Sequence, residues 1–74
     1  MMELGMLWLD NDEKRPFDEK VQRAADYYLD KYGRLPELCL VNQQLLAETK
    51  KVGKVRVEPG SHLQLHHFWL GMNR

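Results

Sequence analysis

The sequence predicts a small α/β (α+β) domain. We expect a four-stranded mixed sheet, with the element order β-α-β-α-β-β and one long amphipathic helix packed on one face. Three observations predict this: a helical apolar stripe over residues 16–32, short apolar runs on both sides of it, and an alternating pattern after residue 54. With 74 residues, the chain is expected to form a single domain spanning residues 1–74.

The first strand is predicted over Met6–Leu9. This run is apolar without interruption and stops at the polar residues Asp10–Glu13. An unbroken apolar run is typical of a strand that is covered on both faces. We therefore expect this strand to be buried on both sides.

The long helix is predicted over Pro16–Tyr32. Pro16 suits a first helical position, and Gly33 suits the left-handed position just past the helix end. Asp18 and Glu19 are favourable near the positive end of the helix dipole. The residues on the apolar stripe are Phe17, Val21, Ala24, Ala25, Tyr28 and Tyr32.

A second strand is predicted over Leu38–Val41, because Pro36 prevents the helix from continuing. A strand, a helix and a strand at this spacing form a crossover unit. We therefore expect parallel strands, with the helix across one face of the sheet. Asn42 is expected to cap a short second helix over Gln43–Thr49.

The last two strands are predicted to form an antiparallel hairpin. Lys54–Glu58 alternates, with its two valines on one face, and Pro59–Ser61 is a turn signal before a returning strand over His62–Leu70. The apolar residues of the returning strand fall into two parity sets, Leu63 with Leu65 and Phe68 with Leu70. A bulge at His66-His67 would place both sets on the core side. Otherwise the far end of the strand is buried on both faces, with His67 and Trp69 beside the first two leucines.

Charge and cysteine content narrow the class of protein. The net charge is zero, but residues 1–37 carry nine acids and six bases, a net −3, whereas residues 38–74 carry two acids and five bases, a net +3. This balance disfavours a free nucleic-acid binder, which usually has an excess of bases. Cys39 is the only cysteine and lies in an apolar run, so we expect a buried, inert thiol and no disulfide. We see no membrane span and no signal peptide, and expect a cytoplasmic protein.

Asp10 and Asp12 are the first candidate site. They follow an apolar strand, and two carboxylates this close can share a divalent metal. The run Leu7–Asp12 resembles the first motif of haloacid-dehalogenase-type phosphotransferases, which implies a nucleophile at Asp10 and a general acid at Asp12. Lys14 departs from the Thr or Val of that motif, and the chain is too short for the remaining motifs. The structural alternative is a solvated turn whose acids favour the helix start.

The histidines His62, His66 and His67 are the second candidate. On an extended strand, His62 and His66 would lie about 13 Å apart, too far to share one metal ion. Adjacent His66 and His67 would point to opposite faces. A metal site here therefore requires special geometry, and structural histidines are the alternative.

A basic stretch is the third candidate. Its basic residues are Lys50, Lys51, Lys54 and Arg56. Trp69 is the one aromatic residue expected on the same surface. Sheet surfaces with basic and aromatic residues bind single-stranded nucleic acid, although no RNA-recognition motif is present. A solvated strand edge and an acidic protein partner are the alternatives.

No motif in the sequence identifies a function. We expect a non-enzymatic interaction module that contacts another protein, or a second copy of itself, through a sheet face or edge, because the strands hold more apolar sequence than one helix covers. The alternatives are a nucleic-acid-binding domain using residues 50–56 and a small metal-dependent hydrolase using Asp10 and Asp12. We expect no cofactor and no membrane partner.

Overall fold

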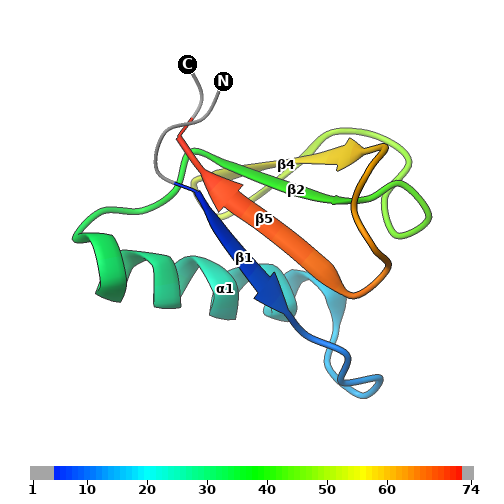
Figure 1. The fold of residues 1–74 in the computed structure, drawn as a ribbon, viewed down its shortest axis with the longest axis horizontal. Helices are drawn as coiled ribbons and strands as arrows, with labels where there is room; N and C mark the ends of the chain where they lie inside the picture. Colours follow the sequence, from blue (N-terminus) through cyan, green and yellow to red (C-terminus); the bar gives the residue numbers. More distant parts are fainter. Residues whose placement is uncertain (1–4, 73–74) are drawn as a thin grey trace.

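The chain folds as an α+β structure with one helix packed on a mixed sheet of five strands (Figure 1). A computed structural model describes residues 5–72. The elements are β1 (Met6–Leu9), α1 (Phe17–Tyr32), β2 (Leu38–Asn42), β3 (Lys50–Val52), β4 (Val55–Gly60) and β5 (His67–Gly71). The predicted fold class is therefore confirmed, with five strands where we predicted four.

The strand order across the sheet is β1-β5-β2-β4-β3. β5 pairs antiparallel with both β1 and β2, so β1 and β2 run parallel to each other with β5 between them. β2 pairs parallel with β4, and β4 pairs antiparallel with β3. The two strands flanking the helix are parallel as predicted, but they are not neighbours.

Two predictions for residues 43–70 are wrong. The segment Gln43–Thr49 forms turns and bends instead of a second helix, and β3 follows it. Asn42 does cap a turn, because its Oδ1 accepts a hydrogen bond from the Gln44 N–H at 2.7 Å. Its Nδ2 donates to the Leu63 carbonyl at 2.7 Å, which ties this turn to a distant loop. That second contact is long-range and has no local sequence signal.

The predicted hairpin between the last two strands is also wrong. β4 forms its hairpin with β3, and Gly53 begins the connecting turn at φ 60°. A glycine at the first central position is typical of a two-residue hairpin turn. The returning strand covers only His67–Gly71, without the bulge we considered, and residues 62–66 form a loop that leads to its place between β1 and β2.

The helix covers one face of the sheet. It begins one residue later than predicted, because Pro16 is the extended residue before the first turn, at φ −61° and ψ 153°. It ends as predicted, with Gly33 at φ 80° donating its N–H to the Leu29 carbonyl at 2.8 Å. Its buried residues are Val21, Ala24, Ala25 and Tyr28, which pack against Met6, Cys39, Val41, Val55, Val57, Phe68 and Leu70 of the sheet. Figure 1 shows α1 along one side of the sheet and no helix on the other.

The prediction that the first strand is buried on both faces is wrong. Met6 is buried and Trp8 half-buried on the helix side, where the Trp8 ring packs on Tyr27 with ring centroids 4.9 Å apart. Leu7 and Leu9 point to the opposite face and are 59% and 58% exposed. The single helix cannot cover both sides of the sheet.

Candidate interaction surface

The face of the sheet that lacks a helix, here called the open face, carries a row of apolar side chains. The strand registers place Leu7 of β1 opposite Trp69 of β5, and Trp69 opposite Leu40 of β2. Directly opposed residues project to the same side of a sheet, so the three side chains form one continuous row. Leu9 lies beside the row on β1. At the far side, Glu58 is opposite Leu40 and begins a polar rim.

A groove of about 640 Å³ lies at one end of this row. Its lining residues are Leu40, Pro59, Gly60, Ser61, His62, Leu63 and Trp69. Four parts of the chain build it: β2, the end of β4, the loop that leads to β5, and β5 itself through Trp69. The hydrogen bond from Asn42 to the Leu63 carbonyl holds the loop against the sheet. Because apolar side chains dominate the lining, the groove suits an apolar side chain of a binding partner.

A second hollow of about 330 Å³ adjoins the groove. It is lined by Leu7, His62, Leu63, Gln64 and His67, and it shares His62 and Leu63 with the groove. The two hollows and the apolar row therefore form one surface running from β1 to the end of β4.

The three histidines do not converge. His62 and His67 line the second hollow, whereas His66 is used through its backbone carbonyl, which accepts a hydrogen bond from the Asp10 N–H at 3.0 Å. Among residues 5–72, no group of three or more His, Cys, Asp or Glu side chains could hold a metal ion. The imidazoles of His62 and His67 therefore lie beside the apolar row, at the second hollow.

Gly5 leaves space for the indole of Trp69. A Cβ atom on Gly5 would lie 2.1 Å from Cζ2 of the Trp69 ring, which is far inside van der Waals contact. Any larger residue at this position would push the indole away from its place in the apolar row. The Tyr32 hydroxyl, 3.4 Å from the Gly5 carbonyl, adds a weak hydrogen bond from the helix.

Asp10 and Asp12 are held by Arg15. Asp10 is buried, and both of its carboxylate oxygens accept hydrogen bonds from Arg15 Nη1, at 3.1 and 3.0 Å. Burial alone would raise the pKa of Asp10, but the Asp12 N–H and the Arg15 guanidinium outweigh it and lower that pKa. Asp12 Oδ1 accepts the Lys14 N–H at 2.9 Å, and Asp12 Oδ2 lies 3.4 Å from Arg15 Nη2. The structural alternative was a solvated turn, but Asp10 is buried and paired with Arg15, and these contacts hold the turn that leads into the helix.

The basic stretch is divided between two faces of the sheet. Lys50 faces the helix, where its Nζ lies 2.8 Å from Asp18 Oδ1. Arg56 lies on the open face, with its Nε 2.7 Å from Glu58 Oε2. Lys51 is opposite Arg56 in the register, whereas Trp69 lies two strands away from β4.

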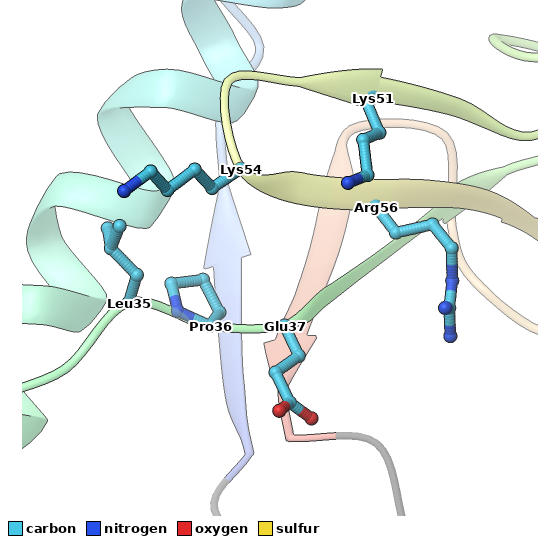
Figure 2. Close-up of a pocket in the computed structure, with 6 residues that line it drawn as sticks. All are labelled: Leu35, Pro36, Glu37, Lys51, Lys54 and Arg56. Carbon is cyan, nitrogen blue, oxygen red and sulfur yellow. The ribbon is translucent and has the colours of Figure 1, made fainter.

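A hollow of about 440 Å³ lies beside this basic stretch. It is lined by Leu35, Pro36, Glu37, Lys51, Lys54 and Arg56. Figure 2 shows that Lys54 points toward the helix side, away from Arg56, and that Glu37 projects below the strands. The three cations therefore do not converge on one point, and they share the hollow with an acid.

Cys39 is buried on the helix side of β2. Burial raises the pKa of its thiol to about 12, which keeps it protonated at neutral pH. The expectation of an inert core cysteine is consistent with this placement.

Sequence reasoning named Trp69 and His62 but missed the leucines of this surface. Leu7 and Leu40 join one row only because β5 lies between their strands, and Leu63 reaches this surface from the loop that leads to β5. The available signal was the excess of apolar strand residues over what one helix can cover. That excess predicts an uncovered face but not its members.

Residues 5–72 include no helix that is long and apolar enough to cross a bilayer. In comparisons with known proteins, the chain matches no protein-family model, no curated protein and no solved structure.

Proposed function

We propose that this protein is a small interaction module that binds a protein partner through the open face of its sheet. The observation that carries the proposal is the continuous apolar surface formed by Leu7, Trp69 and Leu40 with the groove beside them. Exposed apolar surface with a polar rim is typical of protein-binding sites.

The arrangement of the surface supports this assignment. Trp69 is an aromatic anchor at its centre, and its ring lies closely against Gly5. The Arg56–Glu58 ion pair lies on the same face and limits the apolar area on one side. A central aromatic residue with charged residues at the edge is the usual anatomy of an interface.

The two alternatives have less support from the geometry. A hydrolase at Asp10 and Asp12 would have to release Asp10 from Arg15, and no third metal ligand lies nearby among the described residues. Nucleic-acid binding through residues 50–56 would use cations of which two are already paired, Lys50 with Asp18 and Arg56 with Glu58. It also predicts binding that weakens steeply with salt, which a titration at two ionic strengths would detect.

A peptide selection tests the proposed function. Random peptides displayed on phage are selected on the wild-type protein, and the affinity of the selected peptides is measured by fluorescence polarisation. We expect Leu63→Glu to weaken binding by at least about tenfold, because it places a charge in the apolar groove. Leu45→Glu is the control, since Leu45 is an exposed loop leucine that does not line the groove, whereas Leu63 is half-buried in it.

The binding site is located independently by nuclear magnetic resonance. Titration with a selected peptide should shift the signals of the Trp69 indole and of Leu40 and Leu63. Peptides that bind both variants equally, or that shift helix signals alone, would exclude the open face as the binding surface.

A further inference from the structure

We infer that this chain also binds a second copy of itself, by antiparallel pairing of β1 with the partner's β1 across a two-fold axis. This inference goes beyond the proposed function, because the second copy occupies the edge of β1 and leaves the open face free. It follows from the backbone of β1, the contrast between the two sheet edges, and the charges beside β1.

The register of β1 shows which of its backbone groups are available. The Asp10 N–H donates to the His66 carbonyl at 3.0 Å, in continuation of the register that pairs Met6 with Leu70 and Trp8 with Phe68. In an antiparallel pair, alternate residues direct their N–H and C=O groups to the neighbouring strand. Leu7 and Leu9 therefore direct theirs away from β5, to the side where the described chain has no further strand.

The two edges of the sheet differ in what protects them. β3 is short, with the sequence Lys-Lys-Val, and lysines on an edge strand discourage pairing with another chain. β1 has no charged residue, and its two leucines are 59% and 58% exposed. An unprotected apolar edge is the one that accepts a further strand.

A two-fold axis at Trp8 pairs the outward backbone N–H and C=O groups of Leu7 and Leu9 with those of the second copy. It places Leu7 opposite the partner's Leu9, so that each outward N–H donates to an outward carbonyl of the other copy. The leucine side chains of both copies then meet on the open face. The apolar rows that end at Leu7 in each copy join into one surface with a Trp69 on either side.

The charges next to β1 are self-complementary. Arg23 and Asp26 lie on the helix side of this edge and line, with Trp8 and Tyr27, a hollow of about 300 Å³. A two-fold axis through this region reverses their order, so Arg23 of one copy faces Asp26 of the other. The chain has no net charge, so two copies do not repel each other over longer distances.

Sedimentation equilibrium from micromolar to millimolar concentration tests the dimer. The informative variant is Leu7→Pro, which removes an outward N–H without removing a hydrogen bond within the monomer. We expect a dimer for the wild type and at least a 100-fold higher dissociation constant for the variant. Lys51→Pro is the matched control: Lys51 lies one residue before the pair Val52 and Val55 that closes the turn, so its N–H points away from β4.

Further measurements keep the test decisive if a proline variant does not fold. Leu9→Lys should also produce a monomer, whereas Leu45→Lys should not. In the wild type, the Leu7 and Leu9 amides should exchange with deuterium more slowly as protein concentration rises.

A wild-type monomer at every concentration would overturn the dimer. So would a dimer that survives Leu7→Pro and Leu9→Lys. If that monomer still binds selected peptides at the groove, the proposed function stands without the dimer. If the wild type dimerises but its groove selects no peptide, the dimer stands and the proposed function is overturned.

Discussion

Arg15 organises the turn between β1 and α1 at the scale of single residues. Its guanidinium hydrogen-bonds Asp10, and it also lies within ion-pair distance of Asp12 and Glu19, at 3.4 and 3.5 Å. The hydrogen bonds that Arg15 donates to Asp10 raise the pKa of Arg15, so the cation is retained. One basic side chain thus gathers three acids at the start of the helix, where the helix dipole also favours negative charge.

Replacing Asp10 should make folding less dependent on pH. Because the folded-state pKa of Asp10 is lowered, the unfolded chain binds its proton first as pH falls. The stability from this group is therefore complete above about pH 4 and is lost as pH falls through the folded-state pKa. We expect Asp10→Asn to reduce the free energy of unfolding by about 1–2 kcal/mol at pH 7, because Arg15 loses a charged acceptor. At pH 2 to 3 the difference from the wild type should shrink.

Urea denaturation at pH 7 and at acidic pH measures both effects. Asp30→Asn is the control, because Asp30 is an exposed carboxylate on the helix. A difference between wild type and Asp10→Asn that stays constant with pH would contradict this account of the carboxylate.

At the scale of elements, local patterns predicted some segments and failed for others. The helix was predictable because its stripe, Pro16 and Gly33 are all local signals. β3 was not, because Lys50–Val52 is too short to show alternation and becomes a strand only by pairing with β4. The place of β5 was not predictable either, since strand order depends on contacts between residues far apart in the sequence.

The members of the candidate surface could not be predicted for the same reason. Trp69 could be suspected from its parity, but its neighbours Leu7 and Leu40 come from strands some 30 residues or more away in the chain, and no local signal joins them. The sequence grouped Lys50 with the other basic residues of 50–56, although its side chain faces the helix. Its position depends on a contact with a residue far away in the chain. Its ion pair with Asp18 connects β3 to the first turn of α1.

The hairpin of β3 and β4 should depend on Gly53. This residue has φ 60°, a conformation that costs an alanine about 1–2 kcal/mol. A Cβ here would make only an ordinary contact with Gln22, at 3.6 Å, so the cost is conformational. We expect Gly53→Ala to lower the free energy of unfolding by about that amount and Gly53→Asn by less, as measured by urea denaturation. Equal losses for the two variants would indicate a steric cause instead.

At the scale of the whole molecule, one helix on a five-stranded sheet leaves half of the sheet's surface without a second layer. A chain of this size buries only about 60% of the surface that its unfolded form exposes. The core on the helix side is complete, with Tyr28, Phe68 and Leu70 fully buried. Any further apolar burial must therefore come from the open face or from the edge of β1.

If two copies pair through β1, thermal stability should rise with protein concentration. Association stabilises the folded state by mass action, so a tenfold increase in concentration should raise the melting temperature by about 2–5 °C. Leu7→Pro should remove this dependence. Calorimetry over a concentration series measures it, and a wild-type melting temperature that does not change with concentration would count against association.

The unequal edges also determine how far association can proceed. A sheet with two open edges could add a neighbour at each, and repeated addition would lead to fibrils. Here the lysines of β3 protect one edge, so each chain has only one edge, that of β1, that can pair with another copy. Association through β1 therefore stops at a closed dimer. The chain can have an apolar edge strand at β1 without forming fibrils through it.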